Sequence, residues 1–178
     1  MSQKSNTCNT TFYQNEDFVN ELVKDPRRPL SEMAKSLGTY RQKVWRKIKE
    51  LEEKRVVWGY TAVVDEERMG WKSFIILMKM EPISEKQAQL LIRRVLEQEA
   101  EKLKARVVDS FYMNGAYDWI IIFAADSWAT ARKYYDSIRK EYKAFLTEKP
   151  ELIDIVFPIT RYGKINPDME RIMEFVPP

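Results

Sequence analysis

One stretch of nine residues near the N-terminus concentrates positive charge, with no acidic residue inside it. Its cationic side chains are Arg41, Lys43, Arg46, Lys47 and Lys49. Guanidinium and ammonium groups bind phosphate, and arginine can also donate two hydrogen bonds to the edge of guanine. A charged run of this kind is equally what the solvent-facing side of an ordinary helix shows. The elements around the run must therefore decide between the two interpretations.

Helical periodicity places part of this run on one outward face. Apolar residues recur at the spacing of a single helix side, which predicts a helix over residues 40–55. Its buried stripe consists of Val44, Ile48 and Leu51. At about 100° per residue, Gln42, Arg46 and Lys49 then lie opposite that stripe, with Lys43 at the edge. Trp45 lies on the flank, where packing inside the domain and stacking on a base are both open, and packing is favoured.

Two shorter helices precede this one. The first begins near Asn15 and ends at Asp25-Pro26, because a residue before proline avoids the α region. The second covers residues 30–37 and is separated from the third by Gly38-Thr39. Two helices joined by a short turn that contains glycine form a helix-turn-helix. Since its second helix has a cationic outer face, the sequence predicts DNA binding here.

Charge is distributed unevenly between the two parts of the chain. The 178 residues carry 30 basic and 27 acidic side chains, a net charge of +3. Residues 1–60 carry 12 basic and 8 acidic side chains, and residues 61–178 carry 18 and 19. A basic N-terminal module on a near-neutral remainder is typical of a nucleic-acid binder with a separate second function.

Composition excludes several kinds of chemistry. Hydrophobic residues make up 44% of the chain and charged residues 32%, which indicates a globular protein with a core. The chain has no histidine and one cysteine, Cys8, so imidazole catalysis, Cys/His zinc sites and an internal disulfide are excluded. No apolar run approaches the roughly 20 residues of a membrane span. Hydrolysis by a pair of carboxylates stays open, but the composition favours a protein that is not an enzyme. We also expect no metal or other cofactor, no membrane partner, and a reducing, cytoplasmic location.

The remaining chain alternates strand and helix patterns. Strands are predicted over residues 55–64, 73–80, 106–113, 117–124 and 151–160, with helices over 84–104 and 126–145. Apart from the first strand, the order is β-α-β-β-α-β, the ferredoxin-like arrangement. Pro158 predicts that the last strand lies at an edge of the sheet, because proline cannot donate to a ladder on both sides. The fold class is therefore α+β.

The two central strands are apolar on both faces. Residues 73–80 and 117–124 carry large apolar side chains at consecutive positions, whereas a half-exposed antiparallel strand should alternate with polar residues. Two helices can cover only one face of this sheet. The other face must be buried by something outside the subunit, and a second copy of the chain is the economical partner. The sequence thus predicts a homodimer, which would match a palindromic operator in double-stranded DNA.

These features together resemble the Lrp/AsnC family, also called feast/famine regulatory proteins. The resemblance covers about residues 14–160. Residues 37–52 are similar to the family's run from the turn through the recognition helix, and residues 31–34 to its preceding helix. Gly59-Tyr60 and Gly70 match the connector, and Gly115-Ala116-Tyr117-Asp118 is similar to the family's Gly-x-Tyr-Asp signature. Where the family has a serine opening the recognition helix this chain has Tyr40, and where it has a glycine ending that helix this chain has Arg55.

The resemblance implies a sequence-specific transcriptional regulator with a ferredoxin-like C-terminal domain of the RAM type. It implies a dimer, or further assembly into tetramers or octamers, and an amino-acid or other small-molecule effector bound between C-terminal domains. Gly115, Tyr117 and Asp118 would line that site, although Asp118 could equally be a strand-end residue bonded to its own turn. The residues expected at DNA are Arg27, Arg28, Thr39, Tyr40, Arg41, Gln42, Lys43, Arg46 and Lys49.

The expected organisation has five parts. These are a flexible tail at residues 1–13, a helix-turn-helix domain at 14–55, a strand linker at 56–72, an effector-binding and dimerisation domain at 73–162, and a C-terminal extension at 163–178. Two alternatives remain: an effector-insensitive architectural protein that wraps DNA, and an enzyme similar to sirohaem decarboxylases. The missing histidine argues against the enzyme, since those decarboxylases use histidine.

Overall fold

The computed structural model describes residues 15–177, so the predicted tail at residues 1–13 and Cys8 lie outside the described residues. The chain divides into two compact units, Met1–Ala62 and Val63–Pro178. Each unit has its own cluster of buried apolar side chains.

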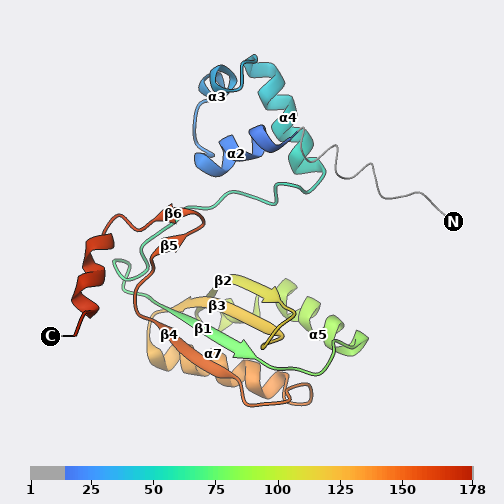
Figure 1. The fold of residues 1–178 in the computed structure, drawn as a ribbon. Helices are drawn as coiled ribbons and strands as arrows, with labels where there is room; N and C mark the ends of the chain where they lie inside the picture. Colours follow the sequence, from blue (N-terminus) through green and yellow to red (C-terminus); the bar gives the residue numbers. More distant parts are fainter. Residues whose placement is uncertain (1–14, 178) are drawn as a thin grey trace. The chain divides into compact units, whose positions relative to one another are not determined.

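The N-terminal unit consists of three helices, α2 (Glu16–Lys24), α3 (Leu30–Ser36) and α4 (Arg41–Glu53) (Figure 1). Its core residues are Leu22, Met33, Ala34, Val44 and Leu51, with Ile48 packed against them. Gly38 in the turn between α3 and α4 has a φ of +59°, a conformation that glycine adopts without strain. The predicted helix-turn-helix and its buried stripe are confirmed.

Helix α4 ends in the left-handed conformation at a residue that is not glycine. Arg55 has a φ of +56°, its N–H donates to the carbonyl of Glu52 at 2.9 Å, and the Val56 N–H donates to the carbonyl of Leu51 at 2.9 Å. This pair of hydrogen bonds is a Schellman motif, in which glycine is the usual residue at the position of Arg55. At the other end Tyr40 has the extended backbone of an N-cap but makes no side-chain capping bond.

The predicted strand linker is wrong for the single chain. No residue from 56 to 71 forms a strand, and β1 begins at Lys72. Val56, Trp58 and Tyr60 are exposed, Trp58 to 95%. These residues favour a strand, but a strand needs a neighbour that takes its N–H and C=O groups, and the described chain offers none beside this segment.

The C-terminal unit contains a four-stranded antiparallel sheet in the order β2-β3-β1-β4. Its strands are β1 (Lys72–Met78), β2 (Ala105–Tyr112), β3 (Trp119–Ala125) and β4 (Glu151–Ile155). Helix α5 (Glu85–Leu96) and the short α6 (Glu99–Lys102) follow β1, and α7 (Trp128–Glu141) follows β3 (Figure 1). The predicted β-α-β-β-α-β order is confirmed.

The core of this unit lies between the sheet and its helices. Phe74, Ile76, Met78 and Phe123 of the central strands are fully buried, together with Tyr135 of α7. Phe74 stacks on Phe123 with ring centroids 5.5 Å apart. Ser127, rather than the residue before it, caps α7, and its hydroxyl accepts from the Thr130 N–H at 3.2 Å. Asp126 accepts a hydrogen bond from the Ser127 hydroxyl.

The helix predicted over residues 84–104 is two helices. Ser84 and Gln87 form a capping box at the start of α5, and Gln98 in the left-handed conformation separates α5 from α6. Within α5, Ile92 and Val95 are 58% and 64% exposed, whereas Gln87 and Arg94 are buried.

The last strand is shorter than predicted. β4 ends at Ile155, so Pro158 lies beyond it, although β4 does form an edge of the sheet. The chain continues into the hairpin β5 (Thr160–Arg161) and β6 (Lys164–Ile165) and the 3-10 helix η1 (Met169–Phe175). Phe175 packs on Phe157 with ring centroids 5.8 Å apart, and Arg171 pairs with Glu67 at 3.3 Å. The extension is therefore docked within the C-terminal unit.

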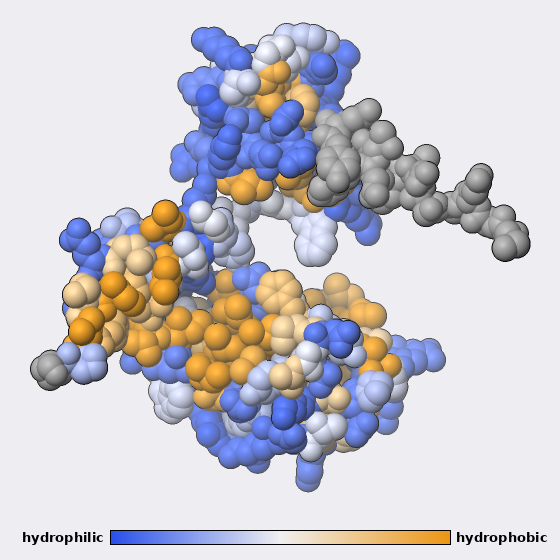
Figure 2. Space-filling view, in the orientation of Figure 1, coloured by the Kyte–Doolittle hydropathy of each residue, from blue (hydrophilic) through white to orange (hydrophobic). Residues whose placement is uncertain are grey.

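Among residues 15–177, no helix of the C-terminal unit covers the second face of the sheet (Figure 1). Ile75, Leu77, Ile120 and Ile122 alternate with the core residues along β1 and β3, so they point to this open face. Phe111 of β2 and Ile153 of β4 extend it and are 52% and 38% exposed. Figure 2 shows apolar surface gathered over the sheet.

Candidate DNA-binding helix and effector turn

The outer face of α4 carries polar side chains that are free to bind a partner. Arg41, Gln42, Lys43, Arg46 and Lys49 are all exposed. None of these five side chains makes a hydrogen bond or an ion pair with any residue between 15 and 177. Long cations that fold against no local acid can reach phosphates and base edges without first breaking a bond.

On the other flank of α4, the lysine side chains already pair with an acidic residue. Glu50 accepts from Lys47 at 2.9 Å and from Lys54 at 2.6 Å. These two hydrogen bonds hold the pKa of Glu50 at about 2, below its ordinary value of 4.5, and the nearby positive charges add to the effect. Lys47 and Lys54 are thereby neutralised locally, so the unpaired positive charge of α4 is on the face opposite Val44.

Arg27 and Arg28, both expected at phosphates, differ in their surroundings. The side chain of Arg27 is exposed and has no partner among the described residues. Arg28 donates to the buried Glu21 at 2.6 Å, and Ser36 also donates to Glu21, at 2.9 Å. These bonds lower the pKa of Glu21, with the Ser36 hydroxyl as the largest cause. Arg28 therefore already links α2 to the segment before α3 through its hydrogen bond to Glu21.

Thr39, Tyr40 and Trp45 flank the outer face of α4. Thr39 is half-buried and donates its N–H to the carbonyl of Ala34 at 2.8 Å, while Tyr40 is 61% exposed. Trp45 was expected to pack inside the domain, but its side chain is 51% exposed and belongs to no core cluster. The structure therefore places an exposed indole beside the cationic face of α4, which the apolar spacing of the sequence did not predict.

The turn between β2 and β3 brings together the three residues expected at an effector. Asp118 accepts from the Met80 N–H through one carboxylate oxygen at 2.7 Å, and its own N–H donates to Met78 at 2.9 Å. Tyr117 donates to Glu151 at 2.7 Å, which raises the pKa of its hydroxyl. Gly115 has no positive φ, and a Cβ there would meet nothing within 4 Å. Asp118 thus bonds its neighbouring strand, and its other oxygen has no protein partner among the described residues.

Comparison with known proteins decides the family. A winged helix-turn-helix DNA-binding model matches residues 19–57. The HTH-type transcriptional regulator LrpA of Pyrococcus horikoshii is 32% identical over 108 residues, which cover 59% of this chain and 70% of that protein. LrpA of Pyrococcus abyssi matches equally well. The chain belongs to the Lrp/AsnC family. It is a DNA-binding transcriptional regulator of the Lrp/AsnC type.

Solved structures confirm the Lrp/AsnC fold across both units. An AsnC family transcriptional regulator from Agrobacterium tumefaciens has a TM-score of 0.60 at 19% identity, covering 86% of this chain and 95% of that one. A feast or famine regulatory protein from M. tuberculosis, complexed with L-methionine, has a TM-score of 0.63 at 21% identity, covering 83% and 92%. These relatives are regulators, and neither the architectural alternative nor the decarboxylase-like enzyme is favoured.

A buried ion cluster in the C-terminal unit of this Lrp/AsnC protein was not foreseen. Glu66 is 6% exposed and pairs with Arg106 of β2 at 2.9 Å and with Arg161 of β5. These residues are 40 and 95 positions from Glu66 in the chain. No local spacing could have indicated such a cluster, because only folding brings β2, β5 and the segment of Glu66 together.

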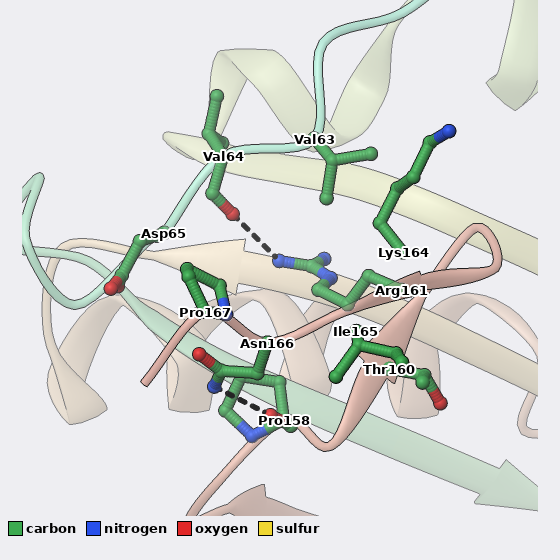
Figure 3. Close-up of a pocket in the computed structure, with 10 residues that line it drawn as sticks. All are labelled: Val63, Val64, Asp65, Pro158, Thr160, Arg161, Lys164, Ile165, Asn166 and Pro167. Atoms are coloured by element: carbon green, nitrogen blue, oxygen red, sulfur yellow. Dashed lines mark hydrogen bonds between the residues drawn. The ribbon is translucent and has the colours of Figure 1, made fainter. Parts of the chain in front are cut away.

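Side chains from residues 158–167 border a hollow of about 260 Å³ beside residues 63–65 (Figure 3). Arg161 donates to the carbonyl of Val64 at 3.5 Å, and Asn166 donates to that of Pro158 at 2.7 Å. Both bonds connect the walls of the hollow to one another. The hollow therefore shows how this member of the Lrp/AsnC family fastens its C-terminal extension.

Within residues 15–177, the Lrp/AsnC chain contains no group of three or more acidic, cysteine or histidine side chains arranged to hold a metal ion. The helices of the described part are also too short or too polar to cross a membrane.

Proposed function

We propose that this regulator binds a palindromic operator as a homodimer, with α4 of each subunit in the major groove. The observation that carries the proposal is the set of exposed side chains on the outer face of α4 that have no partner among the described residues. A helix-turn-helix presents its second helix to base edges, and an arginine or amide there can donate or accept the paired hydrogen bonds that distinguish bases.

The proposed roles follow from position and from the bonds already made. Gln42, Lys43 and Arg46 are assigned to base edges or the groove. Arg27, Arg41 and Lys49 are assigned to phosphates, and Thr39 and Tyr40 to the backbone beside the start of α4. Arg28 completes the phosphate set by sequence, but its bonds to Glu21 make it the weakest contributor.

Arg46→Ala tests the base-reading role. We expect operator affinity to fall by about 1–3 kcal/mol and discrimination between the operator and unrelated DNA to decrease. Titration of labelled operator at several salt concentrations measures both quantities, since each neutralised phosphate adds about −0.9 to the log–log slope. Arg139→Ala, which removes the same charge from the exposed side of α7, serves as the matched control. An operator affinity that does not depend on salt would contradict the proposal.

The homodimer is supported by the open face of the sheet. Its residues are Ile75, Leu77, Phe111, Ile120, Ile122 and Ile153. A contiguous apolar surface on a soluble protein is typical of an interface. Because a twofold axis repeats one patch on both subunits, this face against its copy would place two α4 helices for two half-sites. Assembly into tetramers or octamers would use other surfaces.

An amino-acid effector is proposed at the turn of Gly115, Tyr117 and Asp118. The free oxygen of Asp118 can accept from an α-ammonium group, and Gly115 leaves room for a ligand beside the backbone. A thermal-shift screen against the common amino acids is the measurement. Asp118→Asn keeps an acceptor for Met80 but removes the charge, so it should abolish the shift caused by any active amino acid.

We also infer that the protein acts without catalysis and in the cytoplasm. Its relatives are transcriptional regulators, and residues 19–57 match a DNA-binding model. The two structural units divide the work: the N-terminal unit is assigned to DNA, and the C-terminal unit to assembly and effector binding.

A further inference from the structure

A second hollow, of about 310 Å³, lies inside the C-terminal unit on the helix side of the sheet. It is bounded by α5, α6, β2, β3 and α7. None of Gly115, Tyr117 and Asp118 lines it, so it is separate from the proposed effector turn. Its volume is that of a small-molecule site at the lower end of the usual range.

The floor of this hollow is apolar. Leu91, Trp119, Ile121 and Ile138 line it, and the last three are buried core residues. The Trp119 indole N–H donates to the Ser110 hydroxyl at 2.8 Å, so the ring is held in place by a bond that a ligand need not replace. A floor of this kind favours the apolar body of a ligand over a hydrated ion.

A buried arginine lies in the wall. Arg94 is 9% exposed, donates to the Ser137 hydroxyl at 3.1 Å, and lies over the ring of Tyr142. The carboxylate of Glu141 lies 3.6 Å from Arg94 and 3.4 Å from Arg93. Two guanidinium groups therefore share one carboxylate. Apart from Ser137, Arg94 has no hydrogen-bond acceptor among residues 15–177, although a guanidinium has five N–H donors.

Two tyrosine hydroxyls beside Arg94 also lack a hydrogen-bond acceptor in the described part of the chain. Tyr134 and Tyr142 line the hollow and are 4% and 1% exposed, yet neither hydroxyl makes a hydrogen bond with a described residue. Burial raises the pKa of each to about 12, with Arg94 acting in the opposite direction, so both remain protonated near neutral pH. Neither hydroxyl oxygen is fully enclosed, so both open onto the hollow and can donate to an acceptor that enters it, beside the N–H groups of Arg94 that Ser137 does not use.

We propose that this hollow binds a small organic carboxylate with an apolar body. The carboxylate pairs with the free N–H groups of Arg94 and accepts from Tyr134 or Tyr142, while the body packs on Trp119 and Ile121. A planar carboxylate matches the guanidinium fork and, unlike phosphate, leaves a short apolar chain to fill the remaining space. Glu99 on the rim does not oppose this, because Lys102 pairs with it at 2.7 Å; the exposed Glu101 on the rim selects against more highly charged anions.

The experiment titrates the full-length protein with 3-phenylpropionate and, separately, with the uncharged 3-phenylpropionamide. Calorimetry gives the affinity, and the NMR resonance of the Trp119 indole N–H reports occupancy at this hollow. We expect the carboxylate to bind and to shift that resonance, and the amide to bind at least about 10-fold more weakly, because it lacks the charge-assisted bonds.

Arg94→Met should weaken binding of the carboxylate at least about 10-fold, while Arg93→Met, which removes the same charge from an exposed neighbour, should change it less than about 2-fold. If Arg94→Met unfolds the unit, Val107→Phe fills the mouth of the hollow without touching the arginine and should abolish binding. No binding up to about 20 mM, or undiminished binding in both Arg94→Met and Val107→Phe, would overturn the proposal. Operator binding, measured in parallel, is independent of this outcome.

Discussion

At the scale of single residues, the structure distinguishes cationic side chains that already pair with an acidic residue of the chain from those that do not. Glu50 holds Lys47 and Lys54, and Glu21 holds Arg28, whereas Arg46 and Lys49 have no partner among the described residues. A count of charges cannot make this distinction, because it depends on which acid lies within reach of which cation. The available charges are the ones that can bind DNA.

Glu50 gives the N-terminal unit a pH dependence. Its pKa in the folded chain is about 2, against 4.5 for the ordinary carboxyl, so the ionised form is the one stabilised by folding. The stabilisation is fully present above about pH 4.5 and is lost as the pH falls toward 2. Urea unfolding followed by the helical circular dichroism signal between pH 6 and about pH 2.5 measures it.

Glu50→Gln should flatten this part of the pH profile. Glu53→Gln is the matched control, since Glu53 lies on the same helix and makes no ion pair among the described residues. Equal slopes for the two variants would show that the Lys47 and Lys54 bonds do not stabilise the fold. Because Glu50 is partly exposed, we expect the effect to shrink in high salt.

At the scale of elements, the predicted and observed helices differ mainly in where they end. Periodicity located α2 to α4 and α7 well, because apolar spacing reports which side of a helix is buried. It did not detect the left-handed Gln98 that divides α5 from α6, since nothing in that residue type favours a positive φ.

The C-terminal end of α4 offers a stabilising substitution. Arg55 adopts a left-handed conformation that costs a side chain about 1 kcal/mol relative to glycine. Arg55→Gly should therefore stabilise the N-terminal unit by about 1 kcal/mol in urea unfolding, because both Schellman hydrogen bonds remain. Lys54→Gly, one residue earlier at a φ of −77°, should instead destabilise the unit. A loss of stability in both variants would argue against strain at Arg55.

At the scale of the whole molecule, the open face of the sheet and the unpaired segment after α4 both indicate a missing partner. The helices of the C-terminal unit cover one face of the sheet and leave the other open. Residues 56–63 have strand-forming side chains but no neighbouring strand among the described residues. Both features concern groups that a single subunit leaves unsatisfied. We propose that a second copy satisfies both.

Phe111→Glu combined with Ile153→Glu tests this assembly. Carboxylates on the open face would be buried unpaired in the dimer, so we expect dissociation into monomers at micromolar concentration. Sedimentation equilibrium measures the mass, and operator titration should show a loss of affinity for two half-sites but not for one. Ile92→Glu places the same charge on an exposed apolar site of α5 and should leave the mass unchanged. If the Phe111→Glu, Ile153→Glu variant stays dimeric, the proposal is wrong.

The sequence by itself determined the β-α-β-β-α-β order, the helix-turn-helix, the cationic outer face of α4 and the apolar character of both sheet faces. All of these depend on local spacing, because the periods of helix and strand decide which side chains share a face. The tertiary structure alone decided which charges are neutralised, where β4 ends, how the C-terminal extension docks on Glu67, and that Arg94, Tyr134 and Tyr142 meet at one hollow. Those features join residues that are distant in the chain, and only folding sets the distances between them.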